Sequence, residues 1–149
     1  MLLKDVCTPD VVCCGVETTV REAARLMRAR HVGDLVVVDD VKESRMPLGI
    51  VTDRDLVIEV LAGDTVRMDA QVGNLMHRPV VIAREGEDTE VVVERMRMHG
   101  VRRVPVVDAA GAAVGIVTLN DLLRIVVEGA AALVQIMSRG QNAERRSHR

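Results

Sequence analysis

The sequence predicts an α/β fold built from one strand–helix–strand–strand–helix unit that occurs twice. The first observation is an internal repeat, because residues 49–56 (GIVTDRDL) return as residues 115–122 (GIVTLNDL). The second is that each copy joins β-branched residues, which favour strands, to apolar residues at helical spacing. The third is the length of 149 residues, which is enough for one compact domain or for two small units that share a core.

The first unit opens with a lead-in over residues 1–10 and a short apolar strand at residues 11–14. Residues 17–19 (ETT) have side chains that can cap a helix. The apolar residues that follow recur at helical spacing and predict a helix that ends at about Arg30. We expect Gly33 to end that helix, because glycine commonly follows the last helical turn.

The next strand, at residues 35–38 (LVVV), is expected to be central in its sheet and covered on both faces, because it is apolar throughout. A polar connection over residues 39–47 leads to the third strand at residues 48–52. A helix should begin near Asp55, since apolar residues at i, i+1, i+4 and i+5 within residues 56–61 trace one helical face.

The second unit repeats this order with a consistent offset, and its first strand is expected at residues 80–82 (VVI). Met96 follows Met27 by 69 positions, whereas Asp121 follows Asp55 by 66. The three missing residues therefore belong to the connection before the third strand, where insertions and deletions are tolerated.

The repeat also sets the predicted domain boundaries. They are a first unit at residues 1–62, a linker at 63–71, a second unit at 72–128, and a C-terminal helix with a basic tail at 129–149. We expect the tail to be disordered from Ser138 onward, because it is polar and terminal.

Charge and composition exclude several classes of protein. The chain has 20 basic and 22 acidic residues, so its total charge does not favour general nucleic-acid or membrane binding. It has no apolar run long enough to span a membrane and no secretion signal, which predicts a cytoplasmic protein. It also lacks Phe, Tyr and Trp, so nucleotide bases have no aromatic rings to stack on and any adenine must lie between aliphatic side chains.

Metal binding and catalysis have little support in the sequence. The three cysteines lack Cys-x-x-Cys spacing, and Cys13 and Cys14 are interpreted as buried small hydrophobes, with a redox role as the alternative. The histidines show no His-x-x-x-His spacing, so no metal site is predicted. No set of nucleophile, base and acid is evident either, so we expect no catalysis by this chain alone.

The repeated Thr-x-x-Asp has two interpretations, a helix cap and a binding site. Thr52 and Asp55, like Thr118 and Asp121, have the residue types that cap a helix N-terminus. The same carboxylate can instead accept hydrogen bonds from both hydroxyls of a ribose, while the threonine and the backbone N–H groups face a phosphate. Two copies at matching places favour a duplicated ligand-binding unit.

An apolar strand ending in Asp, followed by Gly-Ile-Val-Thr-x-x-Asp, resembles the CBS domain, a family named from cystathionine β-synthase. The resemblance covers residues 9–127, and the second copy is the closer match, with residues 99–108 (HGVRRVPVVD) ahead of its Gly-Ile-Val-Thr. Two copies in tandem are similar to a Bateman module, a stand-alone CBS pair. The resemblance implies β-α-β-β-α repeats related by a pseudo-two-fold axis, small mixed sheets flanked by helices, and two clefts for adenosine compounds.

The resemblance assigns a main cleft position by position. It implies that Asp121 binds the ribose and that Arg102 and Arg103 bind phosphate, and two adjacent guanidinium groups are well suited to phosphate oxygens. For the two arginines, a solvated loop or a salt bridge in a dimer is the alternative. The set implied for this cleft is Thr8, Val11, Val12, Cys13, Val32, Gly33, Arg102, Arg103, Thr118, Asn120 and Asp121.

A second and weaker cleft is implied around the first copy of the motif. Gly33 and Asp34 stand where Arg102 and Arg103 stand in the repeat, and an aspartate repels phosphate. This cleft is therefore expected to be empty, to prefer a less charged adenosine compound, or to be purely structural. The set implied for it is Thr52, Arg54, Asp55, Arg78, Val80, Ile82 and Val101.

The resemblance thus implies a regulatory sensor that binds AMP, ADP, ATP or an S-adenosylmethionine-type ligand, and we expect a chain that requires no cofactor and is not an enzyme. A homodimer is expected through the helices that begin near Thr19, Asp55, Asp88 and Asp121, because their apolar faces exceed what one chain can cover. An unidentified effector protein is a further expected partner. The alternatives are a structural or interaction dimer with empty clefts and a regulatory subunit of a separate effector enzyme.

Overall fold

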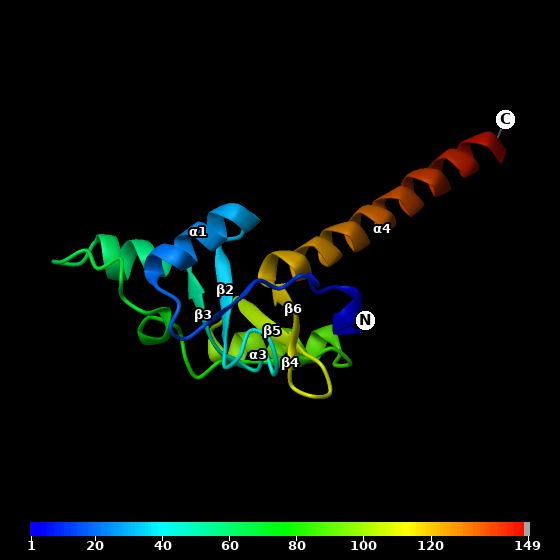
Figure 1. Cartoon of the computed structure of the whole chain (residues 1–149). Helices are drawn as coiled ribbons and strands as arrows, with labels where there is room; N and C mark the ends of the chain where they lie inside the picture. The colour runs from blue at the N-terminus through cyan, green and yellow to red at the C-terminus, as the bar shows by residue number, and fades with distance from the viewer. Residues whose placement is uncertain (148–149) are drawn as a thin grey trace.

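The computed structural model describes residues 1–147 of the chain and the side chains of residues 1–139. Two three-stranded mixed sheets form its centre, as Figure 1 shows. In each sheet the first strand is parallel to the second and the third is antiparallel to it. The strands are β1 (Cys13–Gly15), β2 (Asp34–Val38) and β3 (Pro47–Thr52) in one sheet, and β4 (Ala83–Arg84), β5 (Arg103–Val107) and β6 (Ala113–Thr118) in the other. The predicted duplicated α/β fold is confirmed.

Helices flank both sheets at the places that the repeat requires. The long ones are α1 (Val20–Arg30), α3 (Thr89–His99) and α4 (Leu119–Ser147). The helix that begins within the first Thr-x-x-Asp is α2 (Asp53–Asp55), which continues as a π-helical segment, η2 (Leu56–Leu61). Two short 3-10 turns, η1 (Leu3–Asp5) and η3 (Val72–Asn74), precede the two repeats.

Helix α1 begins as predicted but is ended by a different residue. Thr19 and Glu22 form a reciprocal capping box at its start. Its end is made by His31, which has φ of 54° and whose backbone N–H donates to the Met27 carbonyl, so the prediction that Gly33 ends the helix is wrong. Gly100 takes the same left-handed conformation after α3, with φ of 64°, where a glycine has no Cβ to clash.

The first strand of each repeat lies later than predicted. We expected strands at residues 11–14 and 80–82, whereas sheet pairing begins at Cys13 opposite Val36 and at Ala83 opposite Val106. Val11 and Val12 are nevertheless buried, and the Val12 carbonyl accepts a hydrogen bond of 3.0 Å from the Val36 N–H. Their apolar character therefore reflects burial in the two cores they contact rather than a strand.

Strand β2 is central and covered on both faces, as predicted, since all four residues from Leu35 to Val38 are fully buried. Leu35 and Val37 belong to the core of the first repeat, whereas Val36 and Val38 face the other repeat. There they meet Ala113 and Ile116 in a separate apolar cluster. That cluster holds the two sheets together and brings the two Thr-x-x-Asp motifs into one region.

The two lead-ins are exchanged between the repeats, which the sequence did not predict. Leu3 and Val6 are buried in the core of the second repeat, and Val72 is buried in the core of the first. Thr8 pairs with Ile116 and His77 pairs with Ile50 in matching antiparallel bridges. Each repeat therefore completes its core with a segment that precedes the other.

Gly49 and Gly115 make these bridges sterically possible. A Cβ at Gly115 would lie 2.9 Å from the Thr8 carbonyl oxygen, and one at Gly49 would lie 2.6 Å from the Met76 sulfur. The opposite lead-in therefore approaches each glycine more closely than any side chain would allow.

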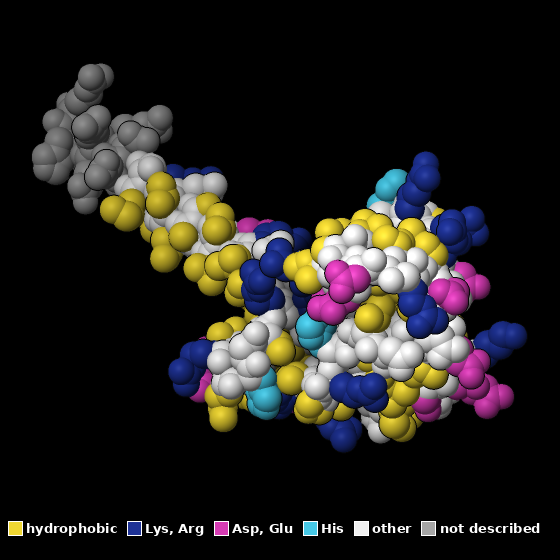
Figure 2. Space-filling model, turned by 90° about the vertical axis from the view of Figure 1, so that its left-hand side faces the viewer, with side chains coloured by type: hydrophobic (Ala, Val, Ile, Leu, Met, Phe, Trp, Pro, Cys, Tyr) yellow, Lys and Arg dark blue, Asp and Glu magenta, His cyan; other side chains and the backbone are white. Residues whose placement is uncertain are grey.

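Helix α4 extends beyond the body of the molecule (Figure 1). Residues 138–147 continue the helix, so the prediction of disorder from Ser138 is wrong for them, and His148 and Arg149 lie outside the described residues. A run of alanines and long side chains sustains the helix, and its apolar residues stay exposed (Figure 2). Beyond the second repeat, the large apolar side chains that are exposed among the described residues are Leu133, Val134, Ile136 and Met137.

Candidate functional site

Both copies of Thr-x-x-Asp form helix caps in which threonine and aspartate bond to each other. Asp55 Oδ2 accepts from the Thr52 N–H at 2.7 Å, and the Asp55 N–H donates to Thr52 Oγ1 at 3.2 Å. In the second copy, Asp121 Oδ2 accepts from the Thr118 N–H at 2.8 Å and from Thr118 Oγ1 at 2.7 Å. In both, Oδ2 bonds to the cap, and Oδ1 is the carboxylate oxygen that the cap leaves available.

The two Oδ1 atoms differ in what they contact. Asp55 Oδ1 lies 2.8 Å from Nε2 of His77. Among the described side chains, the cation nearest to Asp121 Oδ1 is Arg124 Nη2 at 3.9 Å, which is beyond hydrogen-bonding distance. Burial, the strongest single influence on Asp55, opposes ionisation, but the hydrogen bonds from His77 and Thr52 outweigh it and lower the pKa of this carboxyl.

A polar pocket of about 500 Å³ lies between the two motifs, where the repeats meet. Residues of both predicted clefts line it, so the structure brings part of each predicted set together. Three arginines and two aspartates leave one net positive charge in the lining. The lining side chains used below are Asp34, Thr52, Arg54, Arg102, Arg103, Thr118 and Asn120.

Arg103 is already paired inside this pocket. Its Nε donates to Asp34 Oδ2 at 2.7 Å, with the two side chains 39% and 19% exposed. Asp34 therefore partly neutralises the charge of Arg103. Arg102 makes no ion pair among the side chains that the structure describes, and its guanidinium is the more available of the two.

The residues expected around the base occupy other surroundings. Val11, Val12 and Cys13 line a separate cavity of about 570 Å³. Val32 packs against the first core. A Cβ at Gly33 would lie 3.1 Å from Asp53 Oδ2, so a side chain there would crowd the central pocket.

The loop before β3 contributes a residue to that second cavity which the sequence analysis missed. Arg45 lies in the left-handed region with φ of 49°, its Nη2 lies 3.5 Å from Cys13 Sγ, and its Nε is buried without a hydrogen-bond partner. An arginine within a polar surface loop gave no sequence signal for this inward position.

The residues expected in the second cleft are dispersed. Arg78 donates from Nη2 to the Gly73 carbonyl at 3.1 Å, and Ile82 is 41% exposed. Val80 is half-buried. Val101 packs against the second core and lines a groove beside α3. The remaining members of that set, Thr52, Arg54 and Asp55, lie at the junction between the repeats.

The cysteines are thiols in different surroundings. Cys14 is buried, and burial raises its pKa to about 11, in agreement with the prediction of a small hydrophobe. Burial also raises the pKa of Cys7, whose sulfur lies against Gly115. Among the described side chains, no three His, Cys, Asp or Glu residues are grouped to hold a metal ion.

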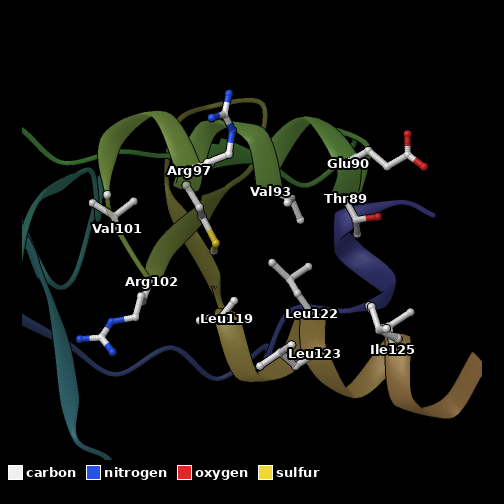
Figure 3. A pocket seen from close by; sticks show the side chains of 13 residues that line it. Thr89, Glu90, Val93, Arg97, Val101, Arg102, Leu119, Leu122, Leu123 and Ile125 are labelled. Atoms are coloured by element: carbon white, nitrogen blue, oxygen red, sulfur yellow. The ribbon is translucent and has the colours of Figure 1, made fainter. Parts of the chain in front are cut away.

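An apolar groove of about 750 Å³ lies between α3 and the first turns of α4. Figure 3 shows Val93 pointing from α3 toward Leu122 and Leu123 of α4, while Glu90 and Arg97 point away from the groove. Its floor is apolar and its edges carry the charged groups. Within the described part of the chain, no helix combines the length and apolarity that a membrane span requires.

Comparison with known proteins identifies the repeats. The family model described as CBS domain matches residues 3–62 and 72–128. The YlbB protein of Bacillus subtilis is 35% identical over 144 residues, which is 95% of each chain. The MK0525 protein of Methanopyrus kandleri is 34% identical over 121 residues, which is 81% of this chain and 60% of that protein.

A solved structure shares the fold of the duplicated unit. The CBS domain pair of protein MJ0100, crystallised in complex with 5′-methylthioadenosine and S-adenosyl-L-methionine, aligns with a TM-score of 0.74 at 28% identity. The alignment covers 87% of this chain and 98% of the other. The family model matches both repeats, each with its own sheet and its own Thr-x-x-Asp cap, and the chain belongs to the CBS domain family.

Proposed function

We propose that this chain is a regulatory module that binds an adenosine-containing ligand in the cleft at Asp121 and has no catalytic activity of its own. The observation that supports this most is Asp121 Oδ1, which accepts no hydrogen bond from the described residues. Thr118 and Asn120, its neighbours in the chain, line the pocket with net positive charge. A carboxylate oxygen accepts from two ribose hydroxyls, and the arginines bind the phosphate that follows the ribose.

The pocket chemistry favours phosphorylated ligands within the adenosine class. Arg102 and Arg54 line the junction with exposed side chains, while Thr118 and Asn120 supply neutral polar groups at its edge. AMP, ADP or ATP would present anionic oxygens to these groups. An S-adenosylmethionine-type ligand would instead place a positively charged sulfonium near Asp34 and Asp53 of the pocket. It is the second class of ligand that the pocket can accept.

Ligand release from purified protein tests the proposal directly. Denaturing freshly purified protein should release an adenine compound that is detected by ultraviolet absorbance and identified by mass spectrometry. The chain has no Trp or Tyr, so the protein contributes almost no background near the adenine maximum. No released adenine, together with no thermal shift from AMP, ATP or S-adenosylmethionine, would favour a structural or interaction dimer with empty clefts.

We also propose a homodimer that covers the apolar groove between α3 and α4. Leu123, Val126 and Val127 on α4 are 51%, 67% and 65% exposed, and Val93 on α3 is 46% exposed. The exposed patch continues along the projecting part of α4 (Figure 2). Burial of such a patch removes apolar area from water, and a second copy supplies a matching apolar surface.

A matched pair of substitutions tests this interface. Leu123→Glu should convert the dimer to monomer in sedimentation velocity at micromolar concentration, because a buried unpaired carboxylate opposes association. Val91→Glu is the control, since Val91 is also 51% exposed on α3 but does not line the groove. A wild-type protein that sediments only as monomer would contradict the proposal, and equal effects of the two substitutions would place the interface elsewhere.

A further inference from the structure

The carboxylate oxygen of Asp55 that the Thr52 cap leaves available already contacts another side chain of this protein. His77 Nε2 lies 2.8 Å from Asp55 Oδ1, and the other oxygen of Asp55 accepts from the Thr52 N–H at 2.7 Å. Both oxygens of this carboxylate therefore have partners before any ligand arrives. At Asp121 the equivalent Oδ1 has no hydrogen-bonding partner among the described residues.

The exchanged lead-ins explain why the two clefts differ in this contact. His77 exchanges backbone hydrogen bonds with Ile50, and Thr8 exchanges them with Ile116, with the shorter bond of each pair at 2.9 Å. Thr8 and His77 are 69 positions apart, which is the offset of the repeat over this part of the chain. The two residues thus occupy equivalent places, but a histidine reaches the acid and no hydrogen bond joins Thr8 to Asp121 in the described part of the chain.

We infer that His77 competes with ribose for Asp55 and thereby determines which of the two clefts takes an adenosine ligand. The inference rests on the proposed function. The Asp121 cleft fills first, because its acceptor is free of hydrogen bonds from the described residues, and the Asp55 cleft fills only when the imidazole moves away.

The exposure of the two partners makes this displacement a local event. The His77 side chain is 73% exposed, whereas Asp55 is 13% exposed. The His77 backbone is fixed by its bridge to Ile50, so the ring can rotate into solvent while the lead-in stays in place. The carboxylate cannot follow it, since the Thr52 cap holds the other oxygen.

Exchanging the two equivalent residues provides the test, with AMP as the probe and calorimetry on the full chain. In His77→Thr, AMP should bind the Asp55 cleft at least about ten-fold more tightly than in wild type, so that a second binding event becomes measurable. The reason is that the substitution removes the imidazole that competes for the Asp55 carboxylate. Thr8→His should weaken the first event by a similar factor. His99→Thr is the control, because the His99 ring contacts the Arg95 carbonyl on α3 and lines neither motif.

The outcomes separate this inference from the proposed function. A wild type that binds AMP once, with His77→Thr leaving stoichiometry and affinity unchanged, would overturn the inference alone. No binding of AMP, ATP or S-adenosylmethionine by any variant would overturn the proposed function and the inference with it. The contact itself can be tested without ligand by nuclear magnetic resonance of the imidazole ¹⁵N nuclei. Asp55→Asn should shift the His77 signals, because Asp55 contacts this ring, and Asp121→Asn should not.

Discussion

Replacing Asp121 with asparagine is expected to remove most AMP binding measured by calorimetry, whereas Asp55→Asn should leave the main isotherm largely intact. Asparagine keeps one carbonyl acceptor but loses the charge, so it binds two ribose hydroxyls poorly. Each charge-assisted hydrogen bond contributes about 1.5–3 kcal/mol, which corresponds to a loss of roughly ten- to a hundred-fold. Asp55 Oδ1 already bonds to His77, so under our inference its substitution affects the cleft that a ligand fills last.

The repeat supplies the control for this experiment. Both aspartates accept from the N–H of their threonine, at 2.7 and 2.8 Å, so both substitutions should weaken a helix cap, by about 0.5–1 kcal/mol. Asp55→Asn should lower the melting temperature further, because it also weakens the bond to His77. A melting temperature that falls at least as far in Asp55→Asn as in Asp121→Asn would show that the binding lost in Asp121→Asn is not a loss of folding. Comparable losses of binding would mean two working clefts, and a loss from Asp55→Asn alone would show that the occupied cleft is the other one.

Arg103→Ala should weaken AMP or ATP by roughly ten- to a hundred-fold while leaving adenosine within about two-fold, because only a phosphate uses the guanidinium. The substitution also leaves the Asp34 carboxylate without its 2.7 Å partner in the central pocket. The pocket then loses its net positive charge. Binding of phosphorylated ligands should weaken as salt rises, in wild type more than in the variant.

Two further variants separate the roles of the arginine and its partner. Asp34→Asn combined with Arg103→Ala should recover part of the lost affinity, since it removes the unpaired carboxylate. Arg97→Ala is the control, because Arg97 pairs with Glu94 on α3 outside the pocket. Equal losses for adenosine and AMP in Arg103→Ala would show that this arginine does not bind phosphate.

The sequence by itself determined the parts of the structure that depend on local pattern. A run of four apolar residues predicted that β2 is buried on both faces, because only a covered strand tolerates such a run. The offset between the copies predicted where the second repeat lies, since duplicated segments fold alike. Thr-x-x-Asp predicted that both acids lie at helix starts, and the cap was one of its two interpretations, because the bonds that make a cap join residues three positions apart.

The tertiary structure alone decided the contacts between residues distant in the chain. Apolar spacing shows that Leu3 is buried but not that it is buried in the opposite repeat. Arg103 meets Asp34 across 69 positions, and His77 meets Asp55 across 22, only because the sheets face each other and the lead-ins are exchanged. Periodicity reports the burial of a residue within its own element, whereas the partner of a charged side chain depends on how elements pack. The asymmetry between the two clefts arises from those packed contacts, although the motifs that form them are nearly identical.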